Sequence, residues 1–279
     1  MHGAGALALI DPRAIIDPSA RLGSNVSVGP WTIIGPQVEI GDDCSIASHV
    51  VLRGPTVMGR SNRVFQFSSI GEDTPALAYG GESTLLEIGD NNVFREGVTV
   101  HRGMVQDEGQ TIIGNDCLLM AYVHVGHDCV LGDHVIMANN SAVSGHCNVG
   151  DHANFGGYAG VPQFRNIGAY SHISGMSLVL KDVPAFLTVM GNPAAAIGLN
   201  IEGMRRRGYS KELIRQLRQA FKVVYRQGNT VKEACSALDS MAQQIPEIAL
   251  FVESIRDSQW GIVRPRRSGE NRGDSPDPD

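Results

Sequence analysis

Histidines in the middle of the chain are the side chains best suited to chemistry. His124, His127, His134 and His146 occur close together in the sequence, and Asp128 directly follows His127. A histidine beside a carboxylate is a typical general base, because the carboxylate orients the imidazole ring and stabilises its protonated form. The same residues are compatible with surface histidines on a strand face, or with a metal site that uses the His124-x-x-His127 pair. Their spacing therefore leaves three roles open.

A six-residue repeat of apolar residues must position these histidines. An apolar residue occurs at every sixth position over residues 10–70, again over 88–100, and again over 113–179. Many of these residues are followed by one of the 33 glycines, which suit tight corners. A helix cannot keep a period of six on one face, whereas short strands joined by corners can. Hexapeptide repeats of this kind predict a parallel β-helix of about eight to nine coils.

If three repeats close one coil, residues 18 positions apart lie beside each other on adjacent coils. Two neighbouring columns then contain His127, Gly145 and Gln163 in one, and Asp128, His146 and Phe164 in the other. The first column places an imidazole next to a glycine whose backbone N–H no side chain covers. Acyl transfer needs this pairing, because a base must deprotonate the attacking hydroxyl and an N–H must stabilise the tetrahedral oxyanion. The columns therefore make acyl transfer a candidate reaction.

The chain divides into three predicted segments. Residues 1–184 form the β-helix, with interruptions of the repeat near 72–87 and 102–111 that we expect to be loops and candidate site elements. Residues 185–263 form an α-helical domain of about three helices, in which Ser210 and Thr230 are expected N-caps. Residues 264–279 are charged and nearly free of apolar residues, which predicts a disordered tail. The expected fold class is mainly β with C-terminal helices.

The composition argues against several classes of function. The chain has 279 residues, a formal net charge of −6 and 42% apolar residues, which disfavours both disorder and nucleic acid as a partner. Its apolar runs are too short to insert in a membrane, and its first residues lack the basic start of a secretory signal, so we expect a cytoplasmic protein. The five cysteines show no CxxC spacing, so we expect small buried residues rather than disulfides or a zinc ribbon.

Three consecutive arginines, at positions 205–207, stand at the start of the helical segment. Adjacent guanidinium groups suit the oxygens of a phosphate or diphosphate. A solvated charge run at a helix end would have the same sequence. Taken alone, the arginines favour neither interpretation.

Four motifs together resemble one family. They are His101-Arg102-Gly103, LLMAYVHVGHDC around His127, the ANN…SGH segment that ends at His146, and NIEGMRRRG at residues 200–208. Over about residues 10–263 the chain is similar to the UDP-N-acetylglucosamine O-acyltransferases that begin lipid A synthesis. The resemblance implies a homotrimer of left-handed β-helices with active sites between subunits. It implies a 3-hydroxyacyl chain on acyl carrier protein as donor, the glucosamine 3-hydroxyl of UDP-N-acetylglucosamine as acceptor, and neither a metal nor a cofactor.

The resemblance also implies residue roles. His127 matches the general base of the family, Asp128 its partner and Gly145 the backbone donor to the oxyanion. The positions that match substrate-binding residues are His101, His124, His146, Gln163, Asn200, Glu202, Arg206 and Arg207. Among these, the last four match residues that hold the uridine and the diphosphate. Gly175 matches the acyl-chain ruler, where a glycine leaves room for a longer chain, of about fourteen carbons.

The expected acceptor pocket departs from the family pattern at three positions. Ala76 and Ala78 stand where the family usually has the aspartate and lysine of Asp-Leu-Lys-Tyr, and Pro162 replaces the histidine of His-Gln-Phe or His-Gln-Tyr. Each missing polar contact would cost about 1.5–3 kcal/mol of substrate binding. The chain could therefore be a working enzyme with a remodelled pocket, a paralogue that acylates another nucleotide sugar such as a 3-amino analogue, or a non-catalytic trimer that binds carrier protein or sugar nucleotide.

Overall fold

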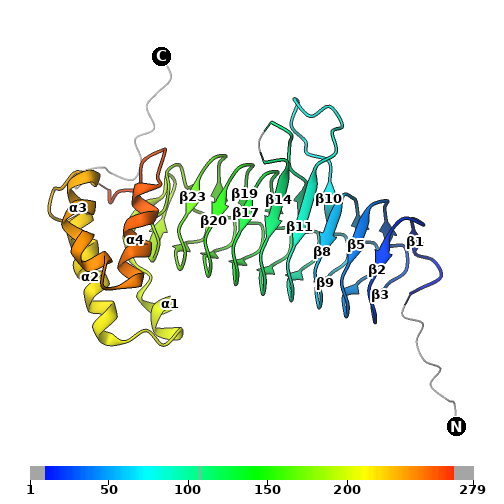
Figure 1. Ribbon diagram of the computed structural model, residues 1–279, viewed down its shortest axis with the longest axis horizontal. Helices are drawn as coiled ribbons and strands as arrows, with labels where there is room; N and C mark the ends of the chain where they lie inside the picture. The colour runs from blue at the N-terminus through cyan, green and yellow to red at the C-terminus, as the bar shows by residue number, and fades with distance from the viewer. Residues whose placement is uncertain (1–9, 107, 267–279) are drawn as a thin grey trace, which may run out of the picture.

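The computed structural model describes residues 10–106 and 108–266. Most of this chain is a prism made of short strands, usually two residues long, that form three faces (Figure 1). Each coil contributes one strand to each face, and strands of successive coils pair in parallel. The six-residue repeat thus forms the left-handed parallel β-helix that was expected, followed by helices at the C-terminal end.

The three sheets follow the order of the coils. The first contains β1 (Ile15–Ile16), β4 (Ile33–Ile34), β7 (Val51–Leu52), β10 (Ser69–Glu72), β13 (Thr99–His101), β16 (His124–Val125), β19 (Ala142–Val143) and β22 (Gly160–Val161). The second contains β2 (Arg21–Leu22), β5 (Val38–Ile40), β8 (Thr56–Met58), β11 (Leu85–Ile88), β14 (Gln110–Ile113), β17 (Val130–Leu131), β20 (Asn148–Val149) and β23 (Asn166–Ile167). The third contains β3 (Ser27–Val28), β6 (Ser45–Ile46), β9 (Arg63–Val64), β12 (Val93–Phe94), β15 (Leu118–Leu119), β18 (Ile136–Met137), β21 (Asn154–Phe155), β24 (His172–Ile173), β25 (Leu187–Met190) and β26 (Ala195–Leu199). Only the last two of these pair antiparallel.

The apolar repeat positions form the core of the prism. From Val28 to Val179 their side chains are 0–4% exposed. Between the strands, the chain turns at corners where non-glycine residues such as Asp128 and His146 adopt a left-handed backbone, with φ of 55° and 60°. In the second half of the prism, coils repeat every 18 residues, as the pairing of His124 with Ala142 shows. Side chains at equivalent corners therefore lie in columns along the prism.

Two excursions interrupt the coils, one between β10 and β11 and one between β13 and β14. Both leave the prism on the same side (Figure 1). The buried guanidinium of Arg102, at the start of the second excursion, donates hydrogen bonds to the carbonyl of Gly71, the carboxylate of Asp73 and the hydroxyl of Tyr79. These bonds tie the bases of the two excursions together, next to the strands that carry the histidines.

The helices follow β26 at the C-terminal end. The described residues form α1 (Ile201–Arg206), α2 (Lys211–Tyr225), α3 (Val231–Ala242) and α4 (Pro246–Arg256). The side chains of Ser210 and Thr230 cap α2 and α3, and Glu233 completes a capping box with Thr230. Among the described residues, none of the helices could span a lipid bilayer. Residues 267–279 of the expected tail lie outside the described residues.

Candidate active site

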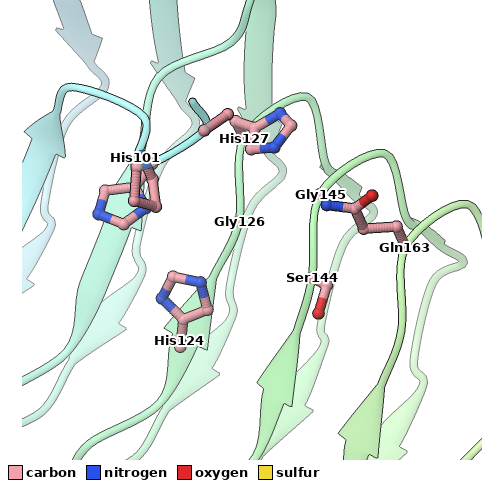
Figure 2. Close-up of a pocket in the computed structure, with 9 residues that line it drawn as sticks. His101, His124, Gly126, His127, Ser144, Gly145 and Gln163 are labelled. Atoms are coloured by element: carbon pink, nitrogen blue, oxygen red, sulfur yellow. The ribbon is translucent and has the colours of Figure 1, made fainter. Parts of the chain in front are cut away.

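A cavity of about 230 Å³ lies where four strands of the first sheet end. It is lined by Pro75, Ala76, His101, His124, Gly126, His127, Ser144, Gly145 and Gln163 (Figure 2). Apart from the first two, which belong to the first excursion, these residues come from the ends of β13, β16, β19 and β22 or directly follow them. The stacking of coils therefore brings together residues that are up to four coils apart in the sequence.

His127 and Asp128 form a buried pair beside this cavity. Nδ1 of His127 lies 2.7 Å from a carboxylate oxygen of Asp128, and each residue is only 6% exposed. The backbone N–H of Met104 donates to both carboxylate oxygens, at 2.9 and 3.0 Å. Because Nδ1 is used by the carboxylate, Nε2 is the ring nitrogen that can take up a proton. The pair has the geometry of a base with its orienting carboxylate.

Gly145 packs directly against the ring of His127. A Cβ placed on Gly145 would lie 2.6 Å from Cε1 and Nε2 of that ring, so no larger residue fits here without a shift. Its neighbours Ser144 and His146 donate their N–H groups to the carbonyls of Val161 and His127. The N–H of Gly145 itself has no hydrogen-bond partner among residues 10–106 and 108–266. The structure thus places an imidazole beside an unused backbone donor, while their roles in catalysis stay predictions.

His101 and His124 form a second wall of the cavity. Their rings meet edge to face with centroids 5.2 Å apart, and Nδ1 of His124 lies 2.9 Å from the hydroxyl of Thr99. Burial, and then the neighbouring His124, His127 and Arg102, lower the pKa of His101 to about 4. Burial, and then His127, also lower the pKa of His124. Both rings are therefore neutral near pH 7 and can offer hydrogen bonds rather than charge.

The histidines that are close in sequence separate into two places. His146 meets His127 edge to face at 4.8 Å and stacks on Phe164 at 4.5 Å. His134 instead stacks on His152, with the rings 4.5 Å apart and almost parallel. It lies in another column of corners and does not line the cavity. The cluster that the sequence suggested therefore loses His134 and includes His101.

One group of side chains in the described part of the chain could hold a metal ion. Ligand atoms of His127, Asp128 and His146 lie within 4.8 Å of one another. However, both carboxylate oxygens already accept the N–H of Met104, and one also contacts His127. His124, which the sequence spacing offered as a ligand beside His127, is not part of this group. The geometry favours an acid–base pair over a metal centre.

Comparisons with known proteins now decide the family. Residues 182–263 match the model of domain 2 of UDP-N-acetylglucosamine O-acyltransferase, and residues 19–54 and 110–145 match that of the bacterial transferase hexapeptide. The acyl-[acyl-carrier-protein]–UDP-N-acetylglucosamine O-acyltransferase of Stutzerimonas stutzeri is 59% identical over 213 residues, which are 76% of this chain and 82% of that relative. The chain belongs to this acyltransferase family.

Solved structures of family members share the whole architecture. LpxA from Acinetobacter baumannii has a TM-score of 0.90 at 50% identity and covers 92% of this chain and 100% of its own. The UDP-N-acetylglucosamine O-acyltransferase (LpxA) from Moraxella catarrhalis has a TM-score of 0.91 at 47% identity, with the same coverage. The β-helix and the helical end are therefore those of the family.

The residues in and next to α1 that match the family's uridine- and diphosphate-binding positions lie outside the cavity. None of Asn200, Glu202, Arg206 and Arg207 lines it within the described chain. Asn200 caps α1 and also donates to the carbonyl of Tyr170, while Arg206 pairs with Glu202 at 3.0 Å. The guanidinium of Arg207 lies 5.7 Å from the ring of Tyr170. A single chain thus does not bring these four side chains to the histidines.

The three residues that depart from the family pattern, and the residue that matches the acyl-chain ruler, differ in how close they lie to the cavity. Ala76 lines it, whereas the exposed Ala78 and the half-buried Pro162 do not. The carbonyl of Pro162 accepts a hydrogen bond from the thiol of Cys147. Gly175 lies in the corner after β24, where a Cβ would meet the carbonyl oxygen of Gly157 at 3.2 Å. Of the three departures from the family pattern, only Ala76 therefore changes the wall of the cavity itself.

Sequence reasoning missed two residues that hold Asp128. Met104 acts through its backbone N–H, which no side-chain pattern reveals. Thr111 is fully buried, and its hydroxyl accepts the backbone N–H of Asp128 at 2.8 Å. Both residues lie in the interruption expected at 102–111, so their location, but not their contact, was visible in the sequence.

Proposed function

We propose that this protein transfers a 3-hydroxyacyl chain from acyl carrier protein to the 3-hydroxyl of UDP-N-acetylglucosamine, the first step of lipid A biosynthesis. The observation that carries the proposal is the buried His127–Asp128 pair beside the unused N–H of Gly145. The curated relatives, at up to 59% identity, are named for this activity. Their names favour this acceptor over another nucleotide sugar and favour catalysis over binding alone.

In this mechanism Nε2 of His127 removes the proton from the sugar hydroxyl as its oxygen bonds to the thioester carbonyl carbon. The carbonyl oxygen becomes an oxyanion and accepts the N–H of Gly145. The carbon–sulfur bond then breaks, and the leaving thiolate takes the proton from His127. Asp128 stabilises the transient imidazolium, and general-base catalysis of this kind contributes about 10²–10⁴-fold. The thioester is already activated, so the chemistry requires no cofactor.

The remaining walls of the cavity would hold the acceptor. The neutral rings of His101 and His124 can exchange hydrogen bonds with sugar or phosphate oxygens, and the amide of Gln163 offers both a donor and an acceptor. His146, packed on His127, would contact the substrate from the neighbouring corner. Ala76 adds only a methyl group, so the acceptor is held with fewer polar contacts than the family pattern provides.

We further propose that the enzyme acts as a cytoplasmic homotrimer. The positions Asn200, Glu202, Arg206 and Arg207 lie outside the cavity of their own chain, so a neighbouring subunit would have to bring such a set to the nucleotide. Two guanidinium groups suit a diphosphate. Gly175 would leave room for a long acyl chain, because it has no side chain that could block the end of that chain.

The test is a transfer assay with purified protein, UDP-N-acetylglucosamine and 3-hydroxyacyl carrier proteins of several chain lengths. We expect a product whose mass is that of the acceptor plus one 3-hydroxyacyl group. UDP-glucose, which lacks the acetamido group, serves as the acceptor control, and light scattering reports the number of subunits. No product from a folded trimer, at any chain length, would refute the proposed function.

A further inference from the structure

The first excursion, residues 73–84 between β10 and β11, forms part of the wall of the cavity. Pro75 and Ala76 line the cavity, and the next residue, Leu77, is fully exposed. Between Glu72 and Leu85 the described chain forms neither a helix nor a strand. No backbone ladder therefore fixes this wall, and its position depends on side-chain contacts.

Arg102 supplies these contacts at the base of the excursion. It directly follows β13, and its side chain is only 7% exposed. One terminal nitrogen of the guanidinium donates to the carbonyl of Gly71, and the other donates to the carboxylate of Asp73 and, at 3.1 Å, to the hydroxyl of Tyr79. That hydroxyl also lies 2.9 Å from the carbonyl oxygen of Glu82. One planar group thus joins the beginning of the excursion to its end.

Stability of the fold does not account for a charged group at this place. Burial of a guanidinium is unfavourable, and Nε of Arg102 has no hydrogen-bond partner in the described chain. Arg102 also lines a second cavity, of about 350 Å³, where four of the six lining residues are charged. Because apolar side chains do not fill this space, packing contributes little to the position of the excursion. The hydrogen bonds of Arg102 hold it instead.

The residues next to Arg102 also shape the catalytic cavity. His101 lines it, and the backbone N–H of Met104 binds the carboxylate of the buried pair. At Gly103 a Cβ would overlap the backbone nitrogen of Gln110, so only glycine lets the second excursion return this closely. Each of these three residues therefore acts on the site through a different contact, and the contact of Arg102 is with the first excursion.

We propose that Arg102 is a positioning residue for the nucleotide-sugar acceptor. It holds the first excursion in place, so that Pro75 and Ala76 complete the wall against which the acceptor binds. This inference rests on the proposed function, which supplies the acceptor. Because Ala76 offers no polar contact, the wall acts through its position and shape. An excursion that leaves its place for part of the time weakens acceptor binding in proportion.

The experiment replaces two arginines of the second cavity with methionine. Arg102→Met removes the bonds to the excursion, while Asp73 is 58% exposed and stays solvated, so no buried charge is left unpaired. We expect KM for UDP-N-acetylglucosamine to rise about tenfold, as for an excursion in place about a tenth of the time, with kcat and the donor KM within about twofold. Arg53→Met is the matched control, because Arg53 pairs with Glu72 of β10, at 3.7 Å, and should leave all three constants within about twofold.

Tyr79→Phe tests the same network without removing a charge. It deletes the hydroxyl between Arg102 and Glu82 and should raise the acceptor KM about threefold at unchanged kcat. Hydrogen exchange gives a second readout that needs no turnover. The amides of residues 76–84 should exchange faster in Arg102→Met and Tyr79→Phe than in the wild type or in Arg53→Met.

Three outcomes would overturn the proposal. These are equal acceptor KM values for Arg102→Met and Arg53→Met, a lower kcat with unchanged KM in Arg102→Met, and exchange of residues 76–84 that Arg102→Met leaves unchanged. If the wild type forms no product, it is the proposed function that fails. UDP-N-acetylglucosamine should then still slow exchange of this segment more in the wild type than in Arg102→Met at the same concentration, and an equal effect on both would refute the role of Arg102.

Discussion

Two neighbouring corners of the β-helix carry a histidine and an aspartate in opposite order. His127 precedes Asp128 after β16, and Asp133 precedes His134 one repeat later. In both corners the second residue has a left-handed backbone, with φ of 55° for Asp128 and 57° for His134. The local backbone is therefore the same, and the difference between the corners comes from the order of the two residues and from what lies around them.

The surroundings of the two aspartates differ most. The carboxylate of Asp133 accepts a hydrogen bond of 2.7 Å from the backbone N–H of Asn115 on the preceding coil, and so links two adjacent coils. The carboxylate of Asp128 is covered by the second excursion, where Met104 supplies its N–H, and Thr111 of β14 accepts the backbone N–H of Asp128. A repeat thus provides equivalent corners, and an excursion turns one of them into a buried acid–base pair.

The largest difference between the two corners should appear when His127 and His134 are each replaced by alanine. His127→Ala should lower kcat by about 10²–10⁴-fold, because the general base is lost. His134→Ala removes a stacked ring away from the cavity and should change kcat by less than about twofold. Steady-state transfer assays measure both, with light scattering to show that the oligomer persists. Equal effects of the two variants would contradict the distinction between the corners.

A methyl group beside His127 should be the next most damaging change. In Gly145→Ala the new Cβ would overlap Cε1 and Nε2 of the imidazole, so the ring must move from its position. A misplaced base should cost about 10²-fold in kcat. Gly198→Ala is the matched control, because nothing lies within 4 Å of a Cβ there. Full activity of Gly145→Ala in the transfer assay would show that the contact does not matter.

The support that Thr111 of β14 gives to Asp128 can be separated from a general effect on stability. Thr111→Val removes the acceptor of the Asp128 N–H and should lower stability by about 1–3 kcal/mol and kcat by about tenfold. Thr32→Val removes an equally buried hydroxyl, which bonds the carbonyl of Ala47, far along the chain from the cavity. We expect a similar loss of stability in urea unfolding but unchanged kcat. If both variants lose activity alike, Thr111 does not position the pair.

The smallest expected effect is the contribution of His101, in the second wall of the cavity, to the loss of folding stability at acidic pH. Burial, followed by the neighbouring cationic groups, lowers the pKa of His101 to about 4, so the folded state binds fewer protons than the unfolded state, where a histidine has its ordinary pKa of about 6.5. Stability should therefore fall as the pH drops from 6.5 to 4, by on the order of 1–3 kcal/mol from this residue. His101→Gln should reduce that fall in urea unfolding at several pH values. An unchanged pH slope would contradict the burial of a neutral ring.

The fold was more predictable than the site. The six-residue apolar repeat specified the coils, and the 18-residue coil that follows from it placed His127 beside Gly145. His101 was harder, because the second excursion interrupts the repeat between it and His124. The resemblance matched His101 to a substrate-binding residue, and the pairing of β13 with β16 places it beside His124. His134 is close to these histidines in the sequence, but it stacks on His152 in another column of corners, in keeping with its absence from the columns that the repeat predicted.

By itself the sequence determined the repeat and the stacking of His127 on Gly145, because both depend on a fixed period that one chain displays directly. Only the tertiary structure decided that Met104 and Thr111 hold Asp128, that His101 stays neutral, and that the arginines of α1 lie away from the cavity of their own chain. The excursions return to the prism along paths that have no period. Their contacts are therefore set by packing between segments distant in the chain, which no local pattern encodes.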